Sequence, residues 1–223
     1  MRKNSNKIII IDYGLGNLHS IKKAVDYFTK DWTVSGDPAA VSSARAVILP
    51  GVGAFAAGMK GLAERGLIGA LREFAGKGKP ILGVCLGAQM LLSEGHEFGA
   101  HQGLNIIKGK VVKFPELAKG VKIPHIGWNK IYPAKDSWQG TILQDVPAKS
   151  DMYFVHSYIL QPEDKKNIFT LTNYEGYEFC SAVREENVYG CQFHPEKSGE
   201  IGLRIIKNFI YNCHCERSNK ELY

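Results

Sequence analysis

The feature that most constrains this chain is a glycine-flanked cysteine between a predicted strand and a predicted helix. Residues 79–84 form a short, mainly apolar run, and residues 88–92 have the composition of a helix. Gly83 and Gly87 flank Cys85 at the spacing of a nucleophile elbow, a sharp turn that presents a nucleophile at the end of a strand. An isolated cysteine is usually a small buried hydrophobe, but an elbow favours an exposed thiol with thiolate character. We therefore predict that Cys85 is a catalytic nucleophile.

The expected partners of Cys85 follow another short apolar run, far downstream. Residues 188–193 have the composition of a strand and lead directly into His194, with Glu196 two residues further on. A cysteine nucleophile needs a base, and the base needs a third group that holds its tautomer. Alone, this His-Pro-Glu segment would more often end a strand and begin a turn. Together with the elbow, it predicts a triad of Cys85, His194 and Glu196.

A glycine-rich turn is a candidate oxyanion hole. Residues 46–49 are apolar, and they are soon followed by Gly51, Val52 and Gly53. Backbone N–H groups of this turn, together with that of Leu86, can stabilise a tetrahedral intermediate. The alternative is an ordinary tight turn between a strand and a helix.

The order of the predicted elements indicates an α/β fold. We expect a strand over residues 7–13, a helix over 17–29 and an interrupted helix over 55–74. Short β-like pieces fill residues 105–184, and Ser198 is expected to cap a last helix. Alternating strands and helices imply a mainly parallel central sheet flanked by helices, with an antiparallel β portion inserted before the final strand and helix.

Residues 1–212 are expected to form a single domain, and residues 213–223 a disordered tail. Cys213, His214 and Cys215 are too few and too closely spaced for a metal site, so we expect no metal. Gly14 and Gly16 begin like a dinucleotide fingerprint, but its third glycine would fall on His19, which argues against a nicotinamide cofactor.

Composition excludes several function classes. Five cysteines, an odd number, indicate reduced thiols and a cytoplasmic protein rather than a disulfide framework, and no apolar run is long enough to cross a membrane. The formal charge of +6 comes from scattered lysines and arginines, so we expect no binding of nucleic acid. This charge could instead favour an acidic protein partner.

These motifs resemble those of the class I, or triad, glutamine amidotransferases. The superfamily resemblance rests on residues 83–89 and 192–198. Three further segments resemble the glutaminase subunits of imidazole glycerol phosphate synthase, namely residues 50–55, 127–129 and 153–158. The similarity extends from about residue 8 to residue 212, nearly the whole chain.

The resemblance implies a reaction, a partner and further site residues. It implies hydrolysis of glutamine to glutamate and ammonia without a cofactor, and transfer of the ammonia to a (β/α)8-barrel cyclase subunit in a heterodimer. That cyclase makes imidazole glycerol phosphate and aminoimidazole carboxamide ribotide in histidine biosynthesis. The resemblance also implies that glutamine is bound by Gln89, Glu97, Ser157 and Tyr158. It implies that the partner is contacted by Asn17, Trp128, Tyr153 and Lys197.

Two alternatives stay open at this point. A paralogous subunit would feed ammonia to a different synthase, for example one that amidates a sugar, and the triad cannot distinguish the acceptors. A stand-alone cysteine hydrolase would turn over glutamine fully without a partner, whereas a non-catalytic scaffold is disfavoured because Cys85, His194 and Glu196 are all present.

Overall fold

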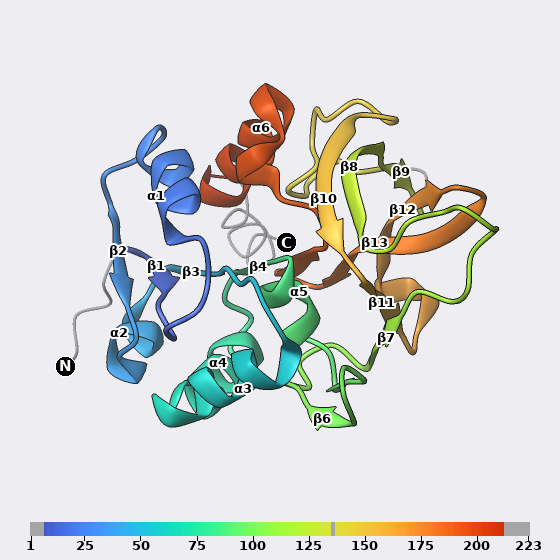
Figure 1. Cartoon of the computed structure of the whole chain (residues 1–223). Helices are drawn as coiled ribbons and strands as arrows, with labels where there is room; N and C mark the ends of the chain where they lie inside the picture. The colour runs from blue at the N-terminus through green and yellow to red at the C-terminus, as the bar shows by residue number, and fades with distance from the viewer. Residues whose placement is uncertain (1–6, 135–136, 212–223) are drawn as a thin grey trace, which may run out of the picture.

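A large mixed β-sheet forms the centre of the computed structural model, which describes residues 7–134 and 137–211 (Figure 1). Five of its twelve strands form a run of parallel neighbours, which is the parallel portion that the sequence predicts. In order across the sheet these five strands are β2 (Trp32–Ser35), β1 (Ile8–Ile11), β3 (Ala46–Leu49), β4 (Ile81–Val84) and β14 (Val188–Cys191). All but the edge strand β2 are fully buried, because helices cover both faces.

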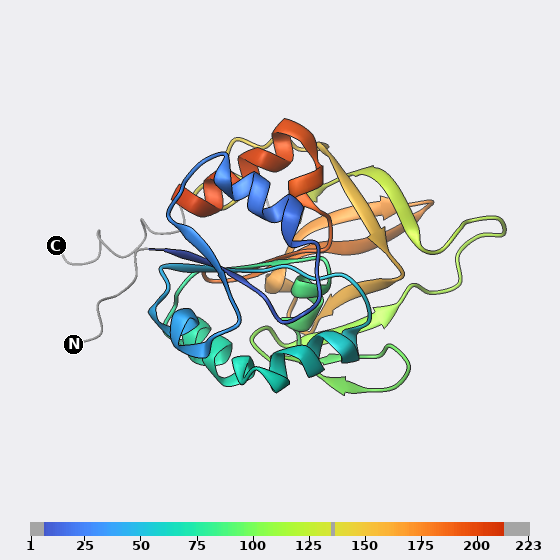
Figure 2. The ribbon, with the colours of Figure 1, turned by 60° about the vertical axis from the view of Figure 1, so that its left-hand side comes forward.

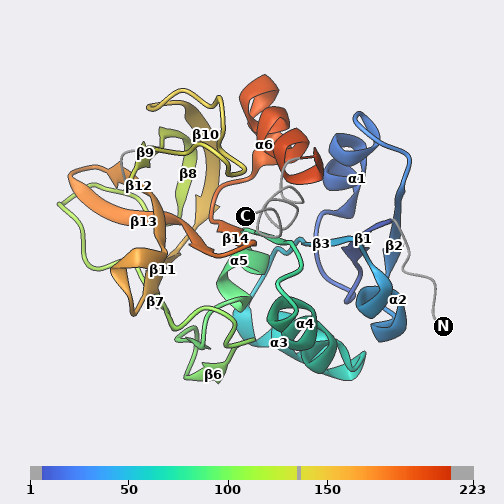
Figure 3. The ribbon, with the colours of Figure 1, turned by 180° about the vertical axis from the view of Figure 1, so that it is seen from behind.

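The rest of the sheet is mainly antiparallel and precedes β14 in the sequence, which confirms the predicted insertion. Figure 3 shows this part beyond β14, seen from behind. Its strands are β13 (Tyr177–Glu185), β11 (Tyr158–Pro162), β7 (Gly109–Lys113), β5 (Glu94–Gly95) and β6 (His101–Gln102), with β12 (Ile168–Tyr174) and β9 (Tyr132–Pro133) joined through β13. The short 3₁₀ helix η1 (Lys165–Asn167) precedes β12. A separate two-stranded sheet pairs β8 (His125–Lys130) with β10 (Asp151–His156).

Helices cover the two faces of the parallel portion (Figure 2). One face carries α1 (Leu18–Asp26) and α6 (Gly199–Tyr211). The other face carries α2 (Pro38–Ser43), α3 (Phe55–Glu64), α4 (Leu67–Gly76) and α5 (Leu86–Met90). Side chains alternate across the sheet, so Ile8 and Ile10 of β1 enter one apolar core and Ile9 and Ile11 enter the other. No helix within the described ranges has both the length and the apolar character to cross a membrane.

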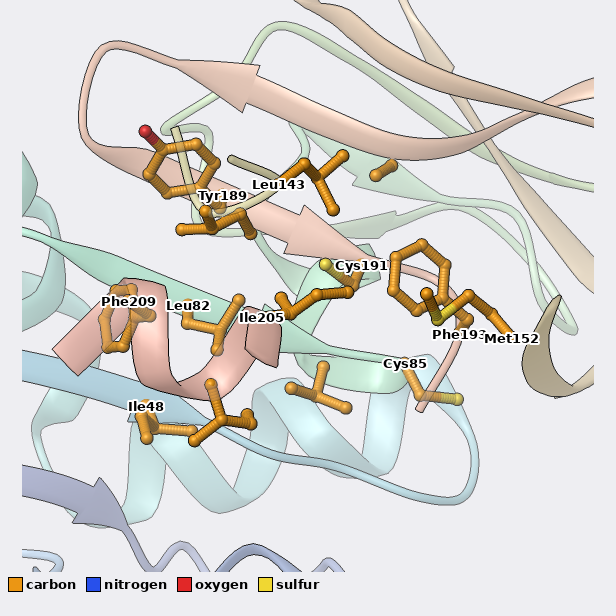
Figure 4. Packing of buried hydrophobic residues seen from close by; sticks show 14 of the residues in the cluster. Ile48, Leu82, Cys85, Leu143, Met152, Tyr189, Cys191, Phe193, Ile205 and Phe209 are labelled. Atoms are coloured by element: carbon orange, nitrogen blue, oxygen red, sulfur yellow. The ribbon is translucent and has the colours of Figure 1, made fainter. Parts of the chain in front are cut away.

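Apolar packing on the α6 face ends at the elbow. Phe209 and Ile205 of α6 pack over the sheet near Leu82 of β4 (Figure 4). Cys85 lies at the edge of this cluster, where β4 ends. The core therefore supports the strand that leads to Cys85, the predicted nucleophile, and ends beside this residue.

The structure refines or departs from the sequence predictions in three local respects. The interrupted helix over residues 55–74 is two helices, α3 and α4, and the break occurs at Gly66, whose φ is +66°. The elements β2 and α2 were not predicted. Ser198 precedes α6, but its side chain is engaged elsewhere: the hydroxyl oxygen accepts from the Tyr153 N–H at 3.0 Å and the hydroxyl donates to the His194 carbonyl at 2.6 Å. The predicted disordered tail, residues 213–223, lies outside the described residues.

Candidate active site

The elbow around Cys85 depends on close approach of the backbone. Cys85 links β4 to α5 with a φ of +53°, a value that residues other than glycine rarely adopt. A Cβ atom on Gly87 would lie 1.8 Å from the carbonyl oxygen of Leu49 on β3, and one on Gly83 would lie 2.8 Å from the Gly87 backbone. Only glycine fits at these two positions, so the sequence motif and the sharp turn have the same physical cause.

Strand pairing brings the predicted base to the nucleophile. β14 runs parallel to β4, with Cys191 opposite Val84, so the segment after β14 lies beside the elbow. His194 Nδ1 and Glu196 Oε1 are 2.7 Å apart, and both side chains are only 2% exposed. Glu196 lies on the short 3₁₀ helix η2 (Pro195–Lys197). The three predicted triad residues thus come together at one end of the sheet.

The charge of His194 is set by opposing effects. Burial alone disfavours the imidazolium, but the Cys85 sulfur and the Glu196 carboxylate favour it and raise the pKa of His194 to about 9. Nε2 of His194 is near enough to Cys85 for the sulfur to raise the pKa of the imidazole. Among the described residues, however, this nitrogen has no hydrogen-bond partner. This arrangement can hold a thiolate–imidazolium pair.

The sulfur of Cys85 opens into a cavity of about 340 Å³. Cys85 is 7% exposed, less than an elbow predicts, so the cavity is its route to solvent. The predicted glutamine-binding residues Gln89, Glu97, Ser157 and Tyr158 all line this cavity, as do Val52, Gly53 and Leu86 of the predicted oxyanion hole. The structure therefore gathers residues from four distant segments around one thiol.

Two cavity-lining side chains are fixed by hydrogen bonds. Gln89 Nε2 lies 3.4 Å from the Tyr158 carbonyl oxygen and 3.0 Å from Gln192 Oε1. Glu97 Oε2 accepts a hydrogen bond from the Phe55 N–H at 2.7 Å, at the start of α3. These contacts orient an amide and a carboxylate at the cavity wall.

The predicted oxyanion turn has its donor occupied. The Leu86 N–H donates to the Gly51 carbonyl at 3.3 Å, and the Tyr13 hydroxyl donates to the Pro50 carbonyl at 2.9 Å. Gly53 has a φ of +107°, which glycine alone adopts readily. In this arrangement the Gly51 carbonyl occupies the Leu86 N–H, so this N–H is not available to the oxyanion of a bound substrate.

Sequence reasoning predicted a structural role for His156, which lines the cavity, but missed its pairing with a second buried histidine, His125. His125 Nδ1 lies 3.2 Å from His156 Nε2, and the other ring nitrogen of His156 donates to the Tyr158 carbonyl at 2.8 Å. Burial lowers the pKa of His125 to about 4 and that of His156 to about 3, so both rings are neutral. They support the cavity wall, and only strand pairing of β8 with β10 could have revealed them.

Three of the four predicted interface residues lie together. Trp128 is 57% exposed, and its ring centroid is 6.0 Å from that of Tyr153 on the neighbouring strand. The Lys197 ammonium lies 5.7 Å from the Tyr153 ring centroid. Asn17, the fourth predicted residue, lies at the start of α1, where its side chain accepts a hydrogen bond from the Ser20 N–H. Helix α1 in turn contacts η2, the element that carries Lys197.

An elbow cysteine beside a buried histidine–carboxylate pair, at the end of a parallel sheet covered on both faces, has the geometry of a catalytic triad with a cysteine nucleophile. The family described as glutamine amidotransferase class-I matches residues 9–213, and the chain belongs to this family.

Curated relatives narrow the assignment. Subunit HisH 1 of imidazole glycerol phosphate synthase from Legionella pneumophila (strain Paris) is 46% identical over 212 residues, which cover 92% of this chain and 99% of the relative. Subunit HisH from Aquifex aeolicus (strain VF5) is 45% identical over 204 residues, covering 91% and 95%. Within the class I family, the chain belongs to the HisH subunits of imidazole glycerol phosphate synthase. The solved structure of PurLQS from Thermotoga maritima shares the fold, with a TM-score of 0.69, 18% identity and coverage of 92% and 98%.

Proposed function

We propose that this chain is the glutaminase subunit of an imidazole glycerol phosphate synthase and that Cys85, His194 and Glu196 are its catalytic triad. The observation that carries the proposal is the cavity onto which the Cys85 sulfur opens, lined by Gln89 and Glu97. A carboxylate and an amide at its wall suit the ammonium and carboxylate groups of an amino acid. The subunit would work in the cytoplasm, where thiols stay reduced.

The proposed reaction has two balanced halves. The Cys85 thiolate attacks the side-chain carboxamide carbon of glutamine, and imidazolium His194 protonates the departing ammonia. Water then attacks the thioester, loses a proton to His194 and releases glutamate and the thiol. In both halves, Glu196 Oε1 accepts a hydrogen bond from His194 Nδ1, 2.7 Å away. This contact orients the ring so that Nε2 faces the reacting atoms.

Stabilising the oxyanion requires a change in the turn at residues 50–53. The Leu86 N–H must exchange the Gly51 carbonyl for the substrate oxygen, and the Gly51–Val52 peptide must turn an N–H toward it. Gly53 and Gly51 supply the backbone freedom for this rotation. Each donor of this kind contributes roughly 10²–10³ in rate.

The proposed partner is a (β/α)8-barrel cyclase that consumes the ammonia in a heterodimer. Exposed Trp128 and half-buried Tyr153 and Lys197 form one group close to the catalytic segment, where ammonia could pass without entering bulk water. Such transfer matters because free ammonia is protonated at neutral pH.

One experiment tests both the nucleophile and the acceptor. The Cys85→Ala variant is purified with the candidate barrel subunit, and synthase activity is measured with glutamine and then with ammonium salt. We expect glutamine-dependent synthesis to vanish and ammonia-dependent synthesis to persist. Loss of both activities would mean that Cys85 is structural. A wild-type pair that makes no imidazole glycerol phosphate would favour a paralogous subunit serving another synthase.

A further inference from the structure

Gln192 is a fully buried amide that contacts the nucleophile. It follows β14 directly, and the Cys85 N–H donates to the Cys191 carbonyl at 2.8 Å, so strand pairing places residue 192 beside the elbow. Its side-chain Nε2 lies 3.7 Å from Cys85 Sγ, within hydrogen-bonding distance for sulfur. A large polar side chain with no exposure is costly to bury unless its groups are paired.

A chain of hydrogen bonds determines which way this amide points. The Tyr158 carbonyl can only accept, so the NH₂ group of Gln89 must face it, at 3.4 Å. The same NH₂ group donates to Gln192 Oε1 at 3.0 Å. Because the oxygen of Gln192 is engaged in this way, its own NH₂ group is the end that faces the sulfur.

Two neighbours act on the sulfur in opposite directions. The Val155 carbonyl oxygen, 3.9 Å away, can accept from a thiol but repels a thiolate. The Gln192 NH₂ group is a donor that favours the thiolate, and hydrogen bonds to ionised groups are about twice as strong as neutral ones. Since Cys85 is only 7% exposed, little water competes with either contact.

We propose that Gln192 stabilises the Cys85 thiolate by donating its side-chain amide to Sγ, while its oxygen holds Gln89 at the cavity wall. The inference rests on the proposed role of Cys85 as nucleophile. In the reaction, the thiol proton passes to His194 Nε2 and the amide supports the charge left on sulfur. The sulfur lone pair then forms the bond to the glutamine carbonyl carbon while the C=O π pair moves to oxygen. Collapse of this intermediate breaks the C–N bond, and ammonia leaves with the proton from His194. The amide contact is regained when water cleaves the C–S bond and releases glutamate.

The test measures ionisation of Cys85 directly. Wild type and Gln192→Met, which keeps the volume but removes the donor, are alkylated with iodoacetamide across pH, and the rate at Cys85 is followed by peptide mapping. We expect the midpoint to rise by about one pH unit in the variant, with an alkylation rate about tenfold lower at pH values below the wild-type midpoint. Gln161→Met is the matched control, because it makes the same change at an exposed position of β11 that does not line the Cys85 cavity. Its alkylation profile should stay close to that of wild type.

Each outcome has a separate meaning. If wild-type Cys85 is not alkylated ahead of the other cysteines, it is not the nucleophile and the proposed function fails. If it is alkylated first but Gln192→Met has the wild-type profile, only the role of Gln192 is overturned. Should the variant not fold, NMR of ¹⁵N-labelled wild type decides: the Gln192 side-chain NH₂ signals should titrate with Cys85 and stop titrating in Cys85→Ala. Signals that ignore Cys85 overturn the inference.

Discussion

His194 shows how a buried base can stay charged at neutral pH. Its burial works against the imidazolium, yet the Cys85 sulfur and Glu196 together raise its pKa to about 9. The group is therefore protonated below about pH 9 and loses its proton above it. A protonated His194 is what the departing ammonia requires, so the alkaline limit of glutaminase activity should follow this pKa.

Replacing Glu196 by Gln should lower that alkaline limit. The amide oxygen can still accept from Nδ1 of His194, but the negative charge that helps raise the pKa is gone. We expect the alkaline limb of the kcat/KM profile to move to lower pH, with a loss of roughly tenfold at the optimum. Glutamine hydrolysis by the partner-bound enzyme, measured between pH 6 and 10, checks this. An unmoved alkaline limb would show that His194 is not the group that titrates.

His194→Ala is the companion variant and should be more severe. It removes the acid and base altogether, so we expect a loss of roughly 10²–10⁴ in kcat at every pH. If Glu196→Gln proves as damaging as His194→Ala, the carboxylate does more than orient the ring.

Cys85 should be labelled ahead of the other cysteines by a glutamine analogue that carries an electrophile. Burial raises the pKa of Cys180 to about 12 and also raises that of Cys191, so neither offers a thiolate at neutral pH. Peptide mapping measures the sites of labelling, and excess glutamine should protect Cys85 because both ligands use the same cavity. Label found chiefly on Cys213 or Cys215 would contradict the assignment.

At the scale of the element, the elbow depends on the contact between α5 and β3. Gly87→Ala would place a methyl group 1.8 Å from the Leu49 carbonyl oxygen, so the helix or the strand must move. We expect a loss of about 3 kcal/mol in the free energy of unfolding and a fall in Tm of roughly 10 °C. Thermal unfolding followed by circular dichroism measures this.

Gly69→Ala is the matched control for that substitution. Gly69 lies within α4, and a Cβ atom there meets nothing within 4 Å. Alanine in an open helical position should stabilise the protein by about 0.5–1 kcal/mol. Equal destabilisation by both substitutions would refute the argument from close approach.

Sequence patterns predicted the elements whose signals are local. The elbow, the buried strands and the final helix were predicted because each depends on a few neighbouring residues and their periodicity. The interrupted helix predicted over residues 55–74 is confirmed as two helices, but a glycine pattern does not tell which glycine breaks it; Gly66 adopts a left-handed φ, whereas Gly58 lies within α3. The edge strand β2 is only half-buried and lacks the apolar run of the central strands.

Contacts between distant segments were beyond sequence reasoning at the site as well. The proximity of Cys85, His194 and Glu196 was predictable because strong motifs surround Cys85 and His194. Gln192 belongs to one of those motifs, but its contact with Sγ depends on the register between β14 and β4. The occupied N–H of Leu86 likewise depends on how the turn after β3 packs against the elbow.

For the whole molecule, we expect the isolated chain to be a poor glutaminase. Its Leu86 N–H is held by the Gly51 carbonyl, so the oxyanion hole lacks a donor until the turn changes. Adding the barrel subunit and its acceptor ligand should raise glutamine turnover by roughly 10²–10³. Steady-state assays of the pure subunit, before and after these additions, test the expectation. A subunit that already runs at the full rate of the complex has a preformed oxyanion hole.

Trp128→Ala should weaken association with the partner subunit. A half-exposed tryptophan beside Tyr153 is a typical interface anchor, and truncating such an anchor raises Kd by roughly 30-fold. Tyr27→Ala is the control, since Tyr27 is 77% exposed at the end of α1, outside the proposed interface. Calorimetric titration with the barrel subunit measures the Kd of both variants. Equal Kd values would show that the interface does not include Trp128.

Strand β10 joins the proposed docking surface to the catalytic segment through its backbone. One edge pairs with β8; on the other, the Tyr153 carbonyl accepts from the His194 N–H at 2.9 Å and the Tyr153 N–H donates to Ser198 Oγ at 3.0 Å. The Tyr153 side chain takes no part in these bonds. An engineer who wished to redirect this ammonia source to another enzyme could therefore rewrite the outward side chains of β8 and β10. The backbone of β10, which makes the hydrogen bonds to His194 and Ser198, would have to keep its present position.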